Sequence, residues 1–225
     1  MTARKPRAKS AAKNDGGVSK GSILLAALAH APREGFTDKV LAEAGEEVGA
    51  SKVEIARLFP DGPLSLVEAF SDYADDAMEA ALAKKDLSRM KVRTRIKTAV
   101  WARIEALRAH KEAARRAGAF LTLPPNAATG MKLLYRSVDR MWRAAGDTST
   151  DFNFYTKRAI LAGVYSSTLM RWFTDQSEGE ADTQAFLDAR IENVMQFEKF
   201  KSDMRERTKD WPSLSDILGR IQGQR

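Results

Sequence analysis

The stretch Gly146–Arg171 constrains the fold of this chain more than any other, and it reads GDTSTDFNFYTKRAILAGVYSSTLMR. It begins with polar residues, Asp147 to Asp151, that can accept hydrogen bonds from the free N–H groups of a new helix. The residues that follow are apolar on nearly every side of that helix. Because a helix that is hydrophobic all round is usually buried all round, the stretch predicts the central helix of an all-α bundle.

Two further long helices are predicted from apolar residues at helical spacing. Thr129–Ala145 is strongly amphipathic and should lie beside the central helix, with Gly146 as its C-cap. Ala181–Arg207 is expected to be the last long helix of the bundle. Its inward residues are predicted to be Phe186, Ile191, Val194, Met195 and Phe197.

The segment 21–83 predicts four helices in a helix-turn-helix layout, which resembles the start of TetR-type repressors. Gly21–His30 is the first helix, and Pro32 and Gly35 are expected to end it. Two short helices, Phe36–Gly45 and Ser51–Leu58, surround a turn, and Leu64–Ala83 is the fourth.

The charges of this region disfavour DNA binding. Between Phe36 and Gly62 there are six acidic residues and three basic ones, and phosphate neutralisation dominates DNA affinity. Where repressors of this type usually carry a phosphate-contacting Tyr and a Lys, this chain has Ala56 and Gly62. Glu54 stands where a small base-reading residue is common. We therefore interpret the motif as a retained scaffold, with a ligand-responsive DNA-binding regulator as the alternative function.

Several separated blocks resemble the coenzyme Q biosynthesis auxiliary proteins of the Coq-nine family. They are the central stretch GDTSTDFNFYTKRA, the upstream blocks MKVRTRIKTAVWARIEA and LLYRSVDRMWRAAG, and the downstream blocks AGVYSST and ADTQAFLDARIENVM. The resemblance implies a TetR-like fold, binding of an isoprenoid or quinone lipid, and assistance to a separate di-iron hydroxylase of the ubiquinone pathway. Phe154 is a departure, because the family usually has Trp there, in a patch implicated in partner docking.

If the resemblance holds, the lipid site is lined from the Thr129 helix, the central helix and the last bundle helix. The candidate lipid-binding residues are Leu134, Val138, Met141, Leu161, Tyr165, Leu169 and Met195. The candidates for docking the hydroxylase, at the start of the central helix, are Asp151, Phe154, Tyr155, Lys157 and Arg158. Aromatic residues beside an Arg are typical of interface hot spots. The same residues could instead form ordinary core and a helix cap.

Basic charge is concentrated in three places although the net charge is only +7. Residues 1–20 form a basic, polar tail that is expected to be disordered, and they lack the apolar core of a secretory signal. Residues 84–118 carry twelve Lys or Arg against three acids, so they either face anionic lipid or form a solvated surface.

The third basic region is the C-terminus, where residues 199–225 carry seven Lys or Arg against four acids. Within it, residues 208–225 are predicted to form an amphipathic helix. Its candidate membrane-contacting residues are Trp211, Leu214, Ile217, Leu218 and Ile221. Docking onto protein is the alternative. Residues 84–207 are expected to form the helical lipid-binding bundle. The expected location of the protein is cytoplasmic and peripheral to the inner membrane, or to the mitochondrial inner membrane in a eukaryote. A homodimer through the last long helices is expected.

The residues for catalysis or metal binding are sparse. Cysteine is absent, and neither His30 nor His110 stands in the E-x-x-H pattern that a di-iron bundle requires. There is no GxSxG, Walker A or dinucleotide motif. The sequence therefore predicts a non-enzymatic protein without a metal or cofactor. No run of about twenty uncharged apolar residues predicts a membrane span.

Overall fold

The structure is a computed structural model that describes residues 17–149 and 152–208, with side chains described in 17–149 and 154–197. All regular elements in those ranges are helices, as predicted. They are α1 (Lys20–Glu34), α2 (Asp38–Glu47), α3 (Lys52–Leu58), α4 (Pro63–Leu82), α5 (Val92–Leu107), α6 (Lys111–Thr122), α7 (Ala127–Ala144), α8 (Phe152–Thr174) and α9 (Ala181–Thr208), with short 3-10 turns at Arg108–His110 and Glu178–Glu180.

The first helix is longer at both ends than predicted. It begins at Lys20 because Ser19 caps it, accepting a hydrogen bond from the Ser22 backbone N–H. Lys20 is therefore helical and does not belong to a tail. The helix also runs through Pro32, which lies in its last turn and removes only one hydrogen-bond donor there. It ends at Gly35, whose φ of 74° belongs to the left-handed region that favours glycine.

Helices α2 and α3 form the predicted helix-turn-helix, and they approach each other closely. A Cβ built on Gly45 of α2 would lie 2.2 Å from Cδ1 of Ile55 in α3, so only glycine fits without a shift. Ser51 and Glu54 cap α3 reciprocally, with the Ser51 N–H donating to Glu54 Oε2 at 2.9 Å. Glu54 thus has a structural role at the start of α3.

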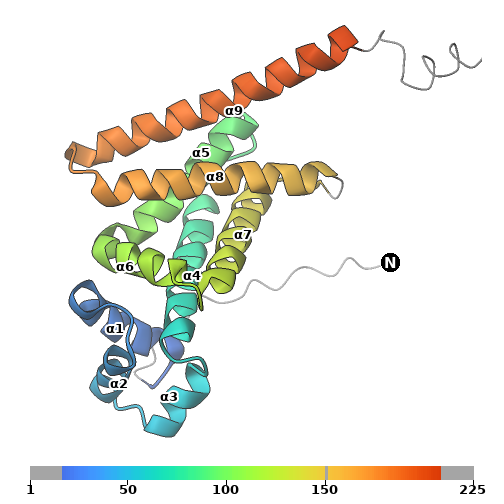
Figure 1. Ribbon diagram of the computed structural model, residues 1–225. Coiled ribbons are helices and arrows are strands. Elements are labelled where there is room, and N and C mark those ends of the chain that lie inside the picture. The colour runs from blue at the N-terminus through green and yellow to red at the C-terminus, as the bar shows by residue number, and fades with distance from the viewer. Residues whose placement is uncertain (1–16, 150–151, 209–225) are drawn as a thin grey trace, which may run out of the picture.

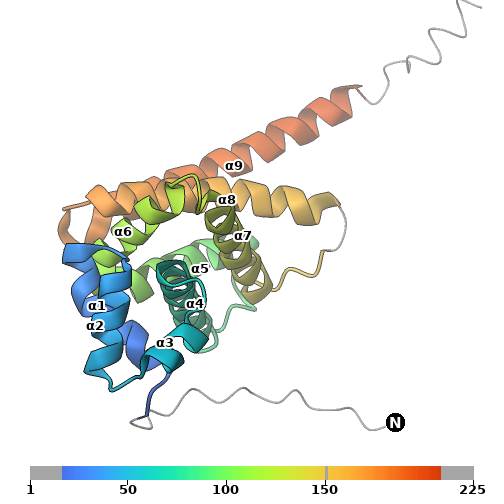
Figure 2. The same ribbon diagram turned by 60° about the horizontal axis from the view of Figure 1, so that its bottom comes forward.

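The remaining helices form two layers beyond this region. Figure 1 shows α1–α3 at one end, α8 and α9 across the opposite end, and α4–α7 between them. In the turned view of Figure 2, α4 lies among α1, α5 and α7, and it makes contacts with all three. The arrangement brings the start of α5, the end of α7, the first half of α8 and the middle of α9 into one neighbourhood.

A buried polar cluster joins four of these helices. Asp75 of α4 accepts hydrogen bonds from Arg103 Nε of α5 at 2.5 Å and from Ser137 Oγ of α7 at 3.0 Å. Arg103 also donates to the Tyr165 hydroxyl of α8. All four side chains are buried, so each polar group has found its partner within the core.

Helix α8 is not buried on every side, contrary to the prediction. Leu161, Tyr165 and Trp172 are buried, but Tyr155 is 64% exposed and Met170 is 71% exposed. Helices α6, α7 and α9 contact α8, and together they leave one stripe of it uncovered. Among the described residues the helix therefore has a free face.

Helix α9 also differs from its predicted packing. Leu187, which was not predicted to be inward, is fully buried, and Ile191 and Val194 are partly buried. Phe186 is half-buried, whereas Met195 and Phe197 are exposed. The reason is that the C-terminal part of α9 projects past the other helices (Figure 1).

Candidate functional site

A cavity of about 610 Å³ lies where α5, α7, α8 and α9 come together. This volume is within the range of small-molecule sites. Nine of its lining residues are apolar: Val92, Ile96, Trp142, Ile160, Leu161, Val164, Ile191, Val194 and Met195. The other four are Lys91, Arg93, Thr156 and Lys157. Mostly apolar walls with a few polar groups suit an amphipathic ligand.

The apolar and cationic residues of the cavity differ in depth. Ile96, Leu161 and Val164 are buried and form its floor. Lys91 and Arg93 are exposed, at the start of α5. Because the cations lie toward solvent, a ligand could place an apolar chain inside and a polar group at the opening.

The predicted lipid-binding residues divide between this cavity and the core. Leu161 and Met195 line the cavity. Val138, Met141 and Tyr165 are buried in the packed core and do not line it. Leu134 and Leu169 are half-buried and pack against the same core.

Sequence reasoning missed the contribution of α5 and Trp142 to the cavity. Val92 and Ile96 do belong to the apolar spacing of α5, and Ile191 and Val194 belong to that of α9. That spacing indicates which face turns inward. It contains no signal for whether the space in front of the face is filled.

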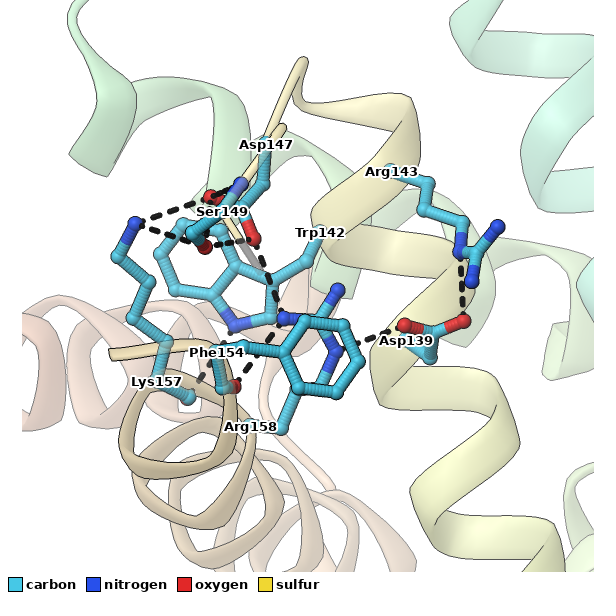
Figure 3. A network of polar contacts seen from close by, with 8 residues as sticks. All are labelled: Asp139, Trp142, Arg143, Asp147, Ser149, Phe154, Lys157 and Arg158. Atoms are coloured by element: carbon cyan, nitrogen blue, oxygen red, sulfur yellow. Dashed lines mark hydrogen bonds and ion pairs between the residues drawn. The ribbon is translucent and has the colours of Figure 1, made fainter. Parts of the chain in front are cut away.

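One wall of the cavity is held by a network of polar contacts, shown in Figure 3. Arg158, only 1% exposed, donates from Nε to Asp139 Oδ1 at 2.7 Å and from a guanidinium nitrogen to Asp147 Oδ2 at 3.1 Å. Lys157 Nζ donates to Asp147 Oδ1 at 2.9 Å. Trp142 Nε1 donates to the Lys157 carbonyl oxygen at 3.2 Å. The network therefore fixes two lining residues, Trp142 and Lys157, relative to each other.

The electrostatics of this network favour ionised Asp147. Burial alone would raise the pKa of its carboxyl group, but hydrogen bonds from Lys157, Ser149 and Arg158 outweigh that effect. The result is a pKa lowered to about 2. Asp147 is thus a fixed negative charge that neutralises part of the charge of Lys157 and Arg158.

The predicted docking residues do not form one exposed surface. Tyr155 is widely exposed, and its ring packs edge-on against Phe154 at 5.1 Å between centroids. The centroid of the Phe154 ring in turn lies 3.4 Å from the guanidinium carbon of Arg158. Arg158 is buried and bound to two carboxylates, which corrects its expected role: it cannot present its charge to a partner in this conformation. Asp151 lies outside the described residues.

The proposed membrane residues Trp211, Leu214, Ile217, Leu218 and Ile221 also lie outside the described residues. In the part of the chain that the structure describes, no helix is both long enough and apolar enough to cross a membrane.

One possible metal-binding group occurs in the described ranges, where ligand atoms of His30, Glu34 and Glu43 lie within 4.8 Å of one another. The sequence patterns did not reveal it. Lys39 Nζ lies 2.7 Å from Glu34 and 3.6 Å from Glu43, so one ammonium group already pairs with both carboxylates. His30 Nε2 contacts Glu47 at 2.6 Å. Each member therefore has another partner, and the group does not support a metal site.

Comparison with known proteins identifies related sequences. The family model described as COQ9 matches residues 127–198. The ubiquinone biosynthesis protein COQ9, mitochondrial, of Rattus norvegicus is 34% identical over 77% of this chain and 57% of its own length. The Homo sapiens protein of the same name is 33% identical over 77% of this chain and 56% of its own length. The Schizosaccharomyces pombe protein coq9 is 29% identical over 86% of this chain and 75% of its own length. The chain thus spans little more than half the length of the two animal relatives.

A solved structure shows the same fold. The TetR transcriptional regulator from Nitrosomonas europaea ATCC 19718 has a TM-score of 0.63 and 19% sequence identity. The match covers 79% of this chain and 98% of the regulator, so it confirms the predicted TetR-like architecture. The sequence matches along most of the chain identify the protein as a member of the COQ9 family, and the structure match shows that it is built on a TetR-like fold.

Proposed function

We propose that this chain acts in ubiquinone biosynthesis as a non-enzymatic auxiliary protein. In this proposal it binds a polyprenyl-quinone-type lipid and presents it to a partner di-iron hydroxylase. The names of its relatives support the pathway. The single observation that carries the lipid-binding step is the apolar cavity between α5, α7, α8 and α9.

Burial of a lipid chain in the cavity would contribute a favourable free energy of binding. Burial of apolar surface contributes roughly 25 cal/mol per Å², so a chain that buries about 200 Å² gains about 5 kcal/mol before ordering costs. Ile96, Leu161 and Val164 supply a buried aliphatic floor for such a chain. Native mass spectrometry of the purified full chain tests this step, because a bound lipid adds a mass that organic extraction removes.

The N-terminal part of α8 is the proposed docking surface for the hydroxylase. Tyr155 is its exposed aromatic residue, and Lys157, half-buried two residues further along α8, is the proposed source of charge steering. Co-purification of the hydroxylase should fall with Tyr155→Ala. The matched control is Met131→Ala, since Met131 is a similarly exposed residue on α7. Equal recovery of the hydroxylase with both variants would place the interface elsewhere.

We further propose that residues 208–225 bind the membrane surface and that the chain forms a homodimer through α8 and α9. Liposome flotation of the full chain and of a chain without residues 208–225 tests the first part, and equal flotation would refute it. The exposed stripe of α8, which includes Met170, supports the second part. Light scattering after size-exclusion chromatography measures the mass of the particle.

A DNA-binding regulator is the alternative function, and the TetR-like fold favours it. The helix-turn-helix disfavours it, because Glu54 caps α3 and exposed Val53 and Ala56 offer no phosphate contact. We expect no sequence-specific complex in fluorescence anisotropy at several salt concentrations. A nanomolar operator that survives physiological salt would support the alternative.

A further inference from the structure

The opening of the cavity is cationic. Its lining contains Lys91, Arg93 and Lys157 and no acidic residue. Arg93 belongs to α5, Lys91 is the N-cap of that helix, and Lys157 belongs to α8. Lys91 and Arg93 are exposed, whereas the aliphatic floor is buried. We propose that the cavity selects amphiphiles with an anionic head, a carboxylate or a phosphate, over neutral ones with the same chain. This inference rests on the proposed lipid-binding function. Because a quinone head is neutral, the inference assigns the cavity a second class of ligand beside the polyprenyl-quinone-type lipid.

The neighbouring acids only partly neutralise these cations. Lys157 is bound to Asp147. Arg93 lies 3.9 Å from Glu192, which is longer than a hydrogen bond, so its donors stay available. Lys91 has no ion pair among the residues that the structure describes. With two acids beside three cations, the opening keeps a positive charge that an incoming anion can neutralise.

The start of α5 adds a second attraction for an anion. Lys91 is the N-cap of this helix and Val92 and Arg93 are its first two residues, and all three line the cavity. No side chain of the described residues caps the helix there. The N-terminus of a helix carries free N–H groups and the positive end of the dipole, both of which favour negative charge. Dipole and side-chain charge thus act at the same edge of the cavity.

Three amphiphiles with the same monounsaturated hydrocarbon tail isolate the effect of the head group. We would measure binding of oleate, oleoyl lysophosphatidate and oleyl alcohol to the delipidated full chain, below their aggregation concentrations. Both anions should bind about tenfold more tightly than the alcohol at low salt, because each can form a few weak, exposed ion pairs with the cations at the opening. The preference should shrink as salt rises, because exposed charges are screened. Comparison of the affinities of oleate and oleoyl lysophosphatidate shows whether a carboxylated lipid or a phospholipid fits the cavity better.

The double variant Lys91→Gln/Arg93→Gln should lose most of this preference and bind oleyl alcohol as before. Lys132→Gln is the matched control, since Lys132 is an exposed lysine of α7 outside the cavity. Equal binding of all three amphiphiles by the unmodified chain would overturn the preference alone. So would a preference that survives in the double variant or at high salt. No binding of any amphiphile would overturn the proposed function as well.

Discussion

Arg158 of α8 is bound through Nε to Asp139 of α7 at 2.7 Å while only 1% of its side chain is exposed. A second contact to Asp147 ties the same guanidinium to the loop that joins the two helices. This pairing holds α7 and α8 together beside the cavity. It makes Arg158 a structural residue and leaves Tyr155 as the exposed residue of the predicted docking group.

Replacing Arg158 with Ala should destabilise the fold by up to about 3–5 kcal/mol, because it removes the buried partner that Asp139 and Asp147 share and leaves them only the more exposed Arg143 and Lys157. Arg143→Ala is the matched control. Arg143 contacts the other oxygen of Asp139 at the same 2.7 Å, but its side chain is 70% exposed. That variant should lose at most about 1 kcal/mol. Urea denaturation measures both, and similar losses would contradict the role assigned to Arg158.

The stability of the fold should fall in acid as Asp147 is protonated. Its pKa drops on folding from 3.8 to about 2, so the stabilisation is present above about pH 4 and is lost as the pH falls toward 2. The size of the shift corresponds to roughly 2 kcal/mol. Asp147→Asn should therefore be less stable at neutral pH and show a flatter profile below pH 4. An NMR titration of the Asp147 carboxyl group with a midpoint near 4 would contradict this.

Two glycine substitutions should have opposite effects. Gly45→Ala places a Cβ 2.2 Å from Ile55 Cδ1 and should cost about 1–3 kcal/mol through overpacking between α2 and α3. Gly163→Ala on the exposed face of α8 meets nothing within 4 Å and should stabilise the helix by up to about 1 kcal/mol. Thermal unfolding checks both, and a stabilised Gly45→Ala chain would show that α2 and α3 pack less closely.

Much of the fold could be predicted from apolar spacing, and the cavity could not. The spacing of Ile96 in α5 and Ile191 in α9 indicates that both residues turn inward. Whether those faces meet or enclose space depends on how far apart the helices settle, which a local pattern does not encode. The burial of Arg158 was missed for a related reason. Charged residues are rarely buried unless paired, and its partners Asp139 and Asp147 come together with it only in the folded chain.

The comparison of Leu161→Trp with Met170→Trp tests the central claim, that the cavity holds a lipid, most directly. Leu161 lines the cavity, whereas Met170 lies on the exposed face of the same helix. Native mass spectrometry should find a lipid adduct on the unmodified chain and on Met170→Trp, and none on Leu161→Trp. Because the added ring fills existing space, Leu161→Trp should also keep a free energy of unfolding within about 1 kcal/mol of the original, less than the cost of overpacking a filled core. A lipid adduct that persists on Leu161→Trp, or a chain that carries no lipid before any change, would contradict the account.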